Sequence, residues 1–293
     1  MKAAGHAGRG IMLNIKNHRI EGAINSELPT GGSLATPRYL IIHYTAGDRV
    51  SGSLETLSTN DTSYHVLIDR DGSIHQVAAF NRRAGHAGVS NWKGRDDMNR
   101  HSISISLANF GGYLRKLPGG VWRAPGGKEL EGHGVLEAEH HLGLSDVTGW
   151  ERFKDPQIAA MLQVVAAVAG AYPTIIDAMG HDEVAMGRRE DPGPAFPWWQ
   201  VQAMFPKRTD DYGPITTVAS PDGFASLRKR RSTSSNELAR LGNGTELHLR
   251  SIAYVFTTDA GGKKVPVYGP WASVARKGTL EHAGFVARSL LAP

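Results

Sequence analysis

The sequence of 293 residues contains no cysteine. A fold without cysteine holds no disulfide, and a metal site within it has no thiolate ligand. Any such site must therefore use histidine nitrogen and carboxylate oxygen. The absence does not separate reducing from oxidising compartments.

Long apolar runs are missing as well. No stretch of this sequence approaches the roughly 20 apolar residues of a transmembrane helix, so we expect no membrane span. The first ten residues contain a lysine without an apolar segment behind it, so no signal peptide is visible. If the protein acts outside the cytoplasm, another process must carry or release it.

The composition is otherwise that of a soluble globular protein, with 40% hydrophobic and 21% charged residues. The formal net charge is +5, which favours polyanionic partners such as nucleic acid, anionic lipid or a charged cell wall. No nucleic-acid-binding motif accompanies this charge, so we expect no nucleic acid partner.

The length predicts two domains. We interpret residues 1–37 as an N-terminal arm, 38–206 as the first domain, 207–221 as a polar linker and 222–293 as the second domain. The basic triplet Lys229 to Arg231 is typical of a solvated loop.

Several elements of the first domain can be predicted from local patterns. The short apolar run of residues 39–42, which is partly β-branched, predicts a buried strand over residues 38–44, and residues 64–77 predict a hairpin with a turn at 70–73. Residues 51–53 favour the N-cap of a short helix. Residues 102–108 alternate serine with apolar residues and predict a strand whose serine face lines a cleft. Asp155 and Pro156 start an amphipathic helix.

Three residues are candidate metal ligands. His181 and Asp191 stand at the two ends of a short loop, whose second end is fixed by Pro192, Gly193 and Pro194. His43 stands near the end of the first predicted strand and is the best candidate for a third ligand. Zinc accepts histidine and carboxylate ligands and keeps a fourth position for water in catalytic sites. The residues alone leave structural roles open for all three.

A second group of histidines, His133, His140 and His141, lies in a Gly- and Pro-rich segment between residues 110 and 152. A second metal site there is conceivable. Adjacent histidines on a short helical segment point apart, however, so we expect solvated surface residues.

The segments Ile41–Gly47, Ser63–Ile68 and Gly180–Trp198 together resemble the zinc N-acetylmuramoyl-L-alanine amidases related to peptidoglycan recognition proteins. The resemblance covers roughly residues 38 to 206. It implies an α/β (α+β) domain with a mixed central sheet flanked by helices. It also implies that Zn²⁺ is bound by His43, His181 and Asp191.

The resemblance further implies catalytic roles for Tyr64 and Arg189 and substrate-binding roles for His65, His86 and Ser106. Two of these positions depart from the family pattern. Ser106 stands where the family usually has a glutamate, and Arg189 stands where it usually has a lysine. The general base is therefore unassigned.

The segment 222–293 resembles bacterial SH3-like cell-wall-binding domains, which implies a small all-β barrel. Such a module would position the enzyme on a polymer. We therefore expect its deletion to weaken binding to intact cell wall and to spare cleavage of a soluble fragment.

The resemblance implies hydrolysis of the amide between N-acetylmuramic acid and L-alanine of the stem peptide by zinc-activated water. The expected partner is peptidoglycan, through its muropeptide stem and glycan strand. The alternative is a peptidoglycan-recognition module that binds without cutting. We expect action on the cell wall after export, injection or lysis, as an endolysin, secreted effector or autolysin. The sequence leaves the oligomeric state open.

Overall fold

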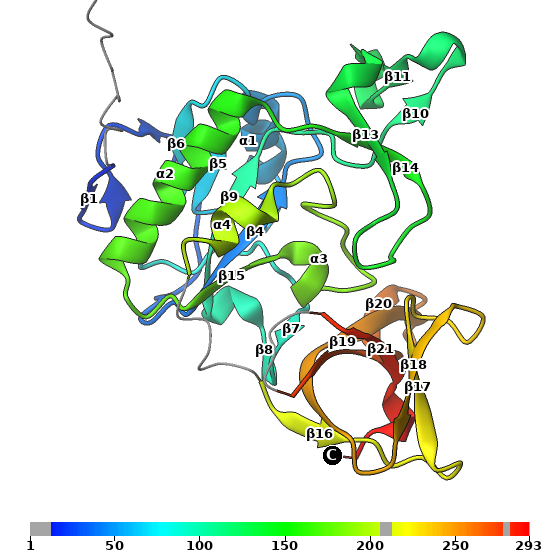
Figure 1. Cartoon of the computed structure of the whole chain (residues 1–293). Helices are drawn as coiled ribbons and strands as arrows, with labels where there is room; N and C mark the ends of the chain where they lie inside the picture. The colour runs from blue at the N-terminus through cyan, green and yellow to red at the C-terminus, as the bar shows by residue number, and fades with distance from the viewer. Residues whose placement is uncertain (1–12, 206–212, 278–281, 293) are drawn as a thin grey trace, which may run out of the picture.

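The computed structural model describes residues 13–205, 213–277 and 282–292 (Figure 1). They form an α/β part, residues 13–205, and an all-β part, made of the described residues from 213 to 292. The predicted arm, linker and second domain each extend into residues outside these ranges.

The α/β part contains fifteen strands and four α-helices. The strands are β1 (Ile15–Lys16), β2 (Arg19–Ile20), β3 (Ile24–Asn25), β4 (Tyr39–Tyr44), β5 (Val66–Ile68), β6 (Ile74–Gln76), β7 (Asn91–Trp92), β8 (Arg95–Asp96), β9 (Ser102–Leu107), β10 (Arg115–Lys116), β11 (Trp122–Arg123), β12 (Glu129–Leu130), β13 (Val135–Ala138), β14 (Thr148–Glu151) and β15 (Asp177–Gly180). The helices are α1 (Val50–Ser58), α2 (Asp155–Ala171), α3 (His181–Val184) and α4 (Trp198–Gln202).

A six-stranded sheet in the order β15-β4-β9-β5-β6-β3 forms the centre of the α/β part. Strands β15, β4, β9 and β5 are parallel neighbours, whereas β6 runs antiparallel to β5. The predicted mixed sheet is thus confirmed. Strand β3 pairs with β6 at the sheet edge, so the prediction that residues 1–37 form only an overlying arm is wrong for residues 24–25.

The two faces of β4 serve different purposes. Side chains alternate across a strand, so Leu40 and Ile42 point to one face and Ile41 and His43 to the other. The first face packs against α2, which contributes apolar side chains at helical spacing such as Met161 to the main core. The second face therefore carries His43 towards α3 and the loops that hold the site.

Most predicted elements of the α/β part are confirmed within one or two residues, including β4, the β5–β6 hairpin, β9 and α2. The N-cap prediction is wrong. Helix α1 follows Arg49, which makes no side-chain cap bond, and residues 51–53 lie inside the helix. The predicted open serine face of β9 is also wrong. Ser102, Ser104 and Ser106 are fully buried, because the histidines of the site and their supporting loops cover them.

The all-β part is one six-stranded sheet, in the order β16-β19-β20-β21-β17-β18, curled around its own apolar cluster (Figure 1). Its strands are β16 (Ile215–Thr217), β17 (Phe224–Arg228), β18 (Glu237–Gly242), β19 (Glu246–Thr258), β20 (Lys264–Arg276) and β21 (Gly284–Ala287). An all-β region was predicted, and its SH3-like identity stays a prediction. Residues 215–217 pair with β19 and belong to this sheet, which corrects the predicted linker.

The two parts are joined by backbone hydrogen bonds. Tyr254 N–H donates to Met186 O at 2.7 Å, and Lys93 N–H donates to Arg250 O at 2.7 Å. The Asn91 side chain exchanges two further bonds with the backbone of Ile252. The all-β part is therefore docked on the loops that lead into the site.

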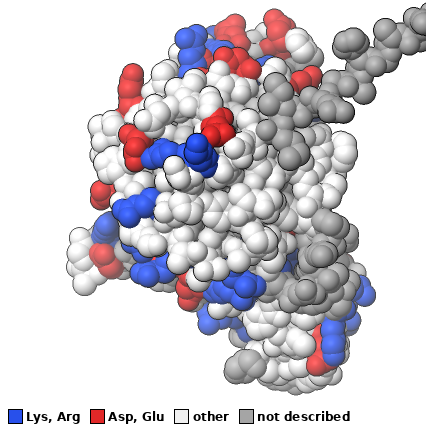
Figure 2. Space-filling view, turned by 90° about the vertical axis from the view of Figure 1, so that its left-hand side faces the viewer, with Lys and Arg blue, Asp and Glu red and all other residues white. Residues whose placement is uncertain are grey.

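No helix among the described residues is long and apolar enough to cross a membrane. On the face drawn in Figure 2, lysine and arginine are mixed with acidic residues and separated by wide uncharged areas.

Candidate metal centre

The parallel pairing of β15 with β4 brings two histidines together. Gly180 pairs with Ile42 in this register. The next residues along the chain, His181 and His43, therefore lie side by side at the carboxyl ends of both strands. The ring centroids of the two histidines are 4.5 Å apart.

The loop after α3 returns Asp191 to the same point. Its backbone carbonyl accepts a hydrogen bond from Asp182 N–H at 2.7 Å. The preceding carbonyl, of Glu190, lies 3.0 Å from His140 Nε2. These two bonds hold the peptide on either side of the Asp191 carboxylate, which is itself buried.

Three side-chain atoms face one another at the centre of the site. His43 Nδ1 lies 3.1 Å from His181 Nδ1 and 2.9 Å from Asp191 Oδ2, and His181 Nδ1 lies 3.1 Å from Asp191 Oδ2. Ligands about 2.0–2.1 Å from a tetrahedral zinc lie about 3.3 Å apart. The three atoms thus form a nearly equilateral triangle close to the size that zinc requires.

The hydrogen bonds behind the triangle fix the histidine tautomers. Ser102 Oγ–H donates to Met98 O at 2.6 Å, so this oxygen accepts from His86 Nε2–H at 3.3 Å. His86 Nδ1 then accepts from His43 Nε2–H at 3.1 Å. The relay leaves a lone pair on His43 Nδ1, directed into the triangle.

His181 has the same arrangement. Its Nε2–H donates to the carbonyl of Ala87 at 3.2 Å, which leaves Nδ1 free for a metal. Two imidazole lone pairs and a carboxylate oxygen within about 3 Å repel one another unless a cation lies between them. The residues therefore fit a divalent cation with two histidine ligands and one carboxylate ligand.

Burial and neighbouring charges keep His43 and Asp191 in the protonation states that bind metal. Burial, followed by the charge of His181, lowers the pKa of His43 to about 4, so its imidazole is neutral at pH 7. Burial acts to raise the pKa of Asp191, but His181 and His43 together hold it well below its usual range. A neutral histidine and an ionised carboxylate are the forms that bind metal.

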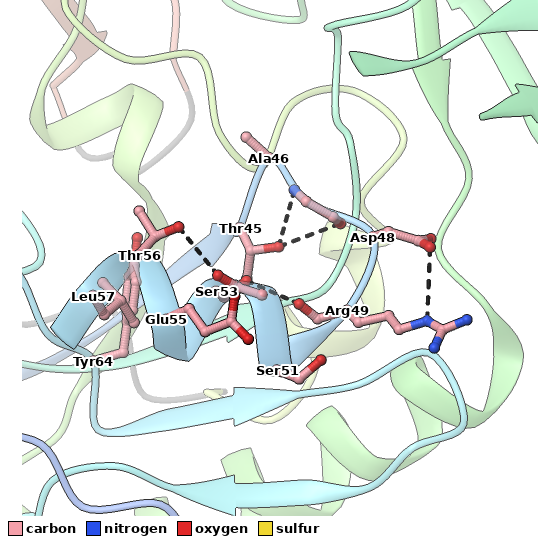
Figure 3. A pocket seen from close by; sticks show the side chains of 12 residues that line it. Thr45, Ala46, Asp48, Arg49, Ser51, Ser53, Glu55, Thr56, Leu57 and Tyr64 are labelled. Carbon is pink, nitrogen blue, oxygen red and sulfur yellow. Dashed lines mark hydrogen bonds and ion pairs between the residues drawn. The ribbon is translucent and has the colours of Figure 1, made fainter. Parts of the chain in front are cut away.

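Tyr64 lies at one side of the triangle, with its ring centroid 5.1 Å from that of His43. Burial, followed by the Asp191 charge, raises the pKa of Tyr64, so its hydroxyl remains protonated and can donate. The residue also lines a pocket of about 690 Å³ between the end of β4 and helix α1. Figure 3 shows Thr45 and the helix residues Ser53 and Thr56 around this pocket.

Arg189 lies at the other side, in a second pocket of about 290 Å³ that includes Asp191 itself. Its backbone is held by a bond from Arg189 N–H to Ala185 O. Its side chain is exposed and has no hydrogen bond or ion pair with another described residue. The positive charge of Arg189 contributes to the low pKa of His43 and partly opposes the rise in the pKa of Tyr64. The charge of Arg189 is therefore felt at the triangle.

Comparison with known proteins identifies the family of this fold. Residues 33–194, more than half of the chain, match the family model described as N-acetylmuramoyl-L-alanine amidase. The chain belongs to this amidase family. The matched segment contains all three atoms of the triangle.

Curated relatives of the amidase include two enzymes with different names. The chain is 34% identical over 143 residues to the 1,6-anhydro-N-acetylmuramyl-L-alanine amidase AmpD of Salmonella typhimurium, covering 48% of this chain and 56% of AmpD. It is 29% identical over 172 residues to the N-acetylmuramoyl-L-alanine amidase AmiD of Escherichia coli, covering 56% of this chain and 51% of AmiD. The chain thus spans about half the length of the curated relatives it matches.

Solved structures of similar proteins include complexes with muramyl peptides. AmiD from E. coli, bound to the substrate anhydro-N-acetylmuramic acid-L-Ala-D-gamma-Glu-L-Lys, matches with 24% identity and a TM-score of 0.43, over 66% of this chain and 65% of AmiD. AmpDh3 from Pseudomonas aeruginosa, bound to an anhydromuramic pentapeptide, matches with 28% identity and a TM-score of 0.42, over 57% of this chain and 59% of AmpDh3.

Two residues predicted to bind substrate are buried. His65 is fully buried, with Nε2 2.8 Å from Arg82 O and Nδ1 accepting from Ser104 N–H at 3.0 Å. His86 is buried and lies behind His43. Both support the site from inside the protein, and their predicted roles in substrate binding stay predictions.

Ser106 pairs with His43 in the β4–β9 register and is fully buried. Its hydroxyl makes no hydrogen bond of good geometry, although it lies near enough to Tyr64 to lower the pKa of that phenol. Ser106 is thus a neighbour of both Tyr64 and His43, and its predicted role in substrate binding stays a prediction.

His140 and His141 were predicted to be solvated, and this is wrong for His140. The two rings stack with centroids 4.5 Å apart, and their Nε2 atoms lie 3.2 and 3.5 Å from Asp182 Oδ2. With Asp182 they form a second set of possible metal ligands. His140 Nδ1, however, accepts a hydrogen bond from Leu142 N–H at 3.1 Å. Its Nε2 therefore carries the proton given to Glu190 O, and His140 positions the Asp191 loop.

Local sequence reasoning missed several supporting residues of the amidase site. Asn99 Oδ1 accepts from the backbone N–H groups of His86 and Ala87. Arg188 Nε donates to the carbonyl of Val89 at 3.1 Å, which ties the loop after α3 to the same segment. The Asn99 bonds span 13 and 12 residues and the Arg188 bond spans 99, so none of them belongs to a regular element that a local pattern could indicate.

Proposed function

We propose that the chain is a zinc-dependent peptidoglycan hydrolase that cleaves the amide bond between N-acetylmuramic acid and L-alanine of the stem peptide. The observation that carries the proposal is the triangle of His43 Nδ1, His181 Nδ1 and Asp191 Oδ2 within an N-acetylmuramoyl-L-alanine amidase segment. When bound, zinc lowers the pKa of a coordinated water and polarises a carbonyl oxygen.

The residues around the triangle would stabilise developing charge and hold the candidate ligands in their metal-binding form. Tyr64 is a neutral hydroxyl donor on one side, and Arg189 is a cation without an ion-pair partner among the described residues on the other. Both would stabilise the negative charge that develops on the carbonyl oxygen during attack. His86 and Ser102 would hold the His43 proton on Nε2 and keep the metal-binding atom free.

The position of Ser106 distinguishes this chain from a site with a carboxylate base. Serine does not accept a proton as a carboxylate does, and its hydroxyl is already buried here. The proposal therefore assigns no general base. A lower rate with an unchanged reaction is the expected consequence.

A non-catalytic recognition module is the alternative function. Recognition alone requires a cleft and no ligand triangle, whereas this chain retains three donors of suitable type and a relay that fixes their protonation. These features favour catalysis. The all-β part would assist binding to cell wall, and the enzyme would reach that substrate after export, injection or lysis.

Mass spectrometry of digested peptidoglycan tests the proposal. Intact sugar strands and peptides with a free N-terminal L-alanine are expected, and chelation of the metal should abolish both. A matched sample of the His181→Ala protein controls for contaminating hydrolases. Binding to peptidoglycan without release of either product would support the recognition module instead.

A further inference from the structure

The basic triplet that begins at Lys229 does not form a solvated loop as predicted. Lys229 Nζ lies 3.1 Å from Glu139 Oε2, and Arg230 Nη2 lies 3.0 Å from Glu139 Oε1. A third bond joins Arg230 to Asp146. These bridges attach the β17–β18 loop of the all-β part to the α/β part, and they fix the position of the next residue, Arg231.

Arg231 enters the pocket beside the metal ligands. It lines the same pocket of about 290 Å³ as Tyr44, Arg189, Glu190 and Asp191. Of the lining residues, Arg231 is the one that comes from the all-β part. The second domain thus contributes a side chain to the wall of the proposed active site.

Gly187 makes room for this side chain. A Cβ atom at position 187 would lie 2.4 Å from Arg231 Nη1 and 2.6 Å from the carbonyl oxygen of Tyr254. Gly187 also has a φ of +81°, a backbone conformation that residues with a side chain rarely adopt. Close contact between the two parts therefore depends on glycine here.

The Arg231 guanidinium has N–H donors that make no hydrogen bond to the described residues. Its Nε is buried and has no hydrogen-bond partner. No hydrogen bond or ion pair joins its side chain to another residue in the described ranges. A buried donor without a partner is destabilising, and a ligand that accepts a hydrogen bond from this donor would remove that cost.

The charges around the pocket favour an anion. Asp191 belongs to the ligand triangle, and Arg188 donates to backbone carbonyls of the neighbouring loop. Arg189 and Arg231 are the remaining cations of the lining, opposed by the one further carboxylate of Glu190. Two guanidinium groups beside a candidate site for a divalent cation match a carboxylate.

We infer that Arg231 of the all-β part binds a carboxylate of the peptide portion of the substrate, so that the second domain completes the substrate cleft. The inference rests on the proposed function. A stem peptide with a γ-linked glutamate, like that bound to AmiD, leaves the glutamate α-carboxylate free and available for such a contact. Arg231 is then a specificity residue, and bond cleavage depends on the residues around the triangle.

The test compares soluble muramoyl peptides that differ in one carboxylate. One pair carries the γ-linked glutamate with a free α-carboxylate or with its carboxamide, and a second pair differs in the same way at the C-terminus. In the pair that contains the carboxylate bound by Arg231, Arg231→Gln should raise KM for the substrate with the free carboxylate about 10-fold to 100-fold and leave kcat within about twofold. KM for the amidated partner should not change. Arg231→Lys should restore part of the loss.

The matched control is Arg240→Gln, which removes the same charge from an exposed side chain on β18. It should behave as wild type with all four substrates. Equal losses on free and amidated substrates, or no loss in either pair, would overturn the inference while leaving the proposed function intact. Failure of the wild-type enzyme to cleave any of the four would overturn both.

Discussion

His86 stands directly behind the ligand His43, with 3.1 Å between His86 Nδ1 and His43 Nε2. The histidine predicted to contact substrate is thus a buried hydrogen-bond acceptor for a metal ligand. His86 in turn gives its Nε2 proton to Ser102 Oγ. Ser102, acting through His86, therefore sets the tautomer of His43 that leaves Nδ1 free for a metal.

Replacing His86 with alanine should weaken zinc binding about 10-fold to 100-fold, because the ligand loses the partner that fixes its tautomer and orientation. Competition with a chelator of known affinity measures the change. His133→Ala serves as control, since His133 is exposed. Unchanged affinity in His86→Ala would mean that the relay does not influence the site.

We expect one zinc per chain, lost when any of His43, His181 or Asp191 is replaced with alanine. A site with three protein ligands that loses one donor binds far more weakly and loses its fixed geometry. Metal analysis of the purified proteins checks this. Stoichiometric zinc in the His181→Ala protein would reject the ligand assignment.

Arg189→Ala should lower kcat on the order of one hundredfold or more, the scale of removing one oxyanion donor. Arg189→Lys should retain substantial activity, because it keeps the charge. The alternative is that Arg189 points to solvent or pairs with Glu190 or Asp182. Its side chain is exposed, and no such ion pair is found among the described residues. A near wild-type rate in Arg189→Ala, with zinc still bound, would assign charge stabilisation to the metal and Tyr64.

His65 should make the protein sensitive to mild acid. Burial lowers its pKa to about 4 in the folded state, against about 6.5 when unfolded. Between these values the unfolded state binds a proton that the folded state does not, so stability falls as the pH falls. The contribution is complete above pH 6.5 and declines by up to about 1.4 kcal/mol per pH unit below it.

Urea unfolding of the wild type and of His65→Gln between pH 6.5 and 4 measures this decline, with metal removed from both. The variant should lose less stability per pH unit than the wild type. His133→Gln, an exposed control, should follow the wild type. Parallel curves for all three proteins would place the acid sensitivity at other groups.

Removal of the all-β part should lower the stability of the α/β part as well as weaken binding to polymer. The amidase-part residues Trp92 and Met186 are almost fully buried. Arg250 lies over the Trp92 ring at 5.0 Å, and Met186 packs in a cluster that includes Ala253 and Phe285. A chain that ends at residue 205 exposes this surface. We expect a loss of at least about 3 kcal/mol in the free energy of unfolding, at about 1.5–3 kcal/mol per large apolar side chain.

The same truncation should reduce cleavage of a soluble muramoyl peptide, contrary to what a tethered binding module predicts. Chemical denaturation and steady-state kinetics on the two proteins give the comparison. A truncated chain that is as stable and as active on the soluble substrate as the full one would restore the interpretation of the second domain as an independent module.

Elements with strong local patterns and residues within recognisable motifs could be predicted from the sequence. The apolar run of β4 and the Asp155–Ala171 helix follow from burial and helix capping, which depend on neighbouring residues, whereas the mixed sheet was implied by the family resemblance. The three candidate ligands could also be named, since their motifs and order along the chain were visible.

The polar groups that support those candidate ligands became visible from the three-dimensional arrangement alone. Ser102, His86 and His43 form one relay, yet a strand residue, a loop residue and a residue of a different strand supply it. Arg231 reaches the pocket of Asp191 because two parts of the chain dock through backbone bonds. Hydrogen bonds between residues far apart in the sequence depend on register and docking, and local patterns do not encode either.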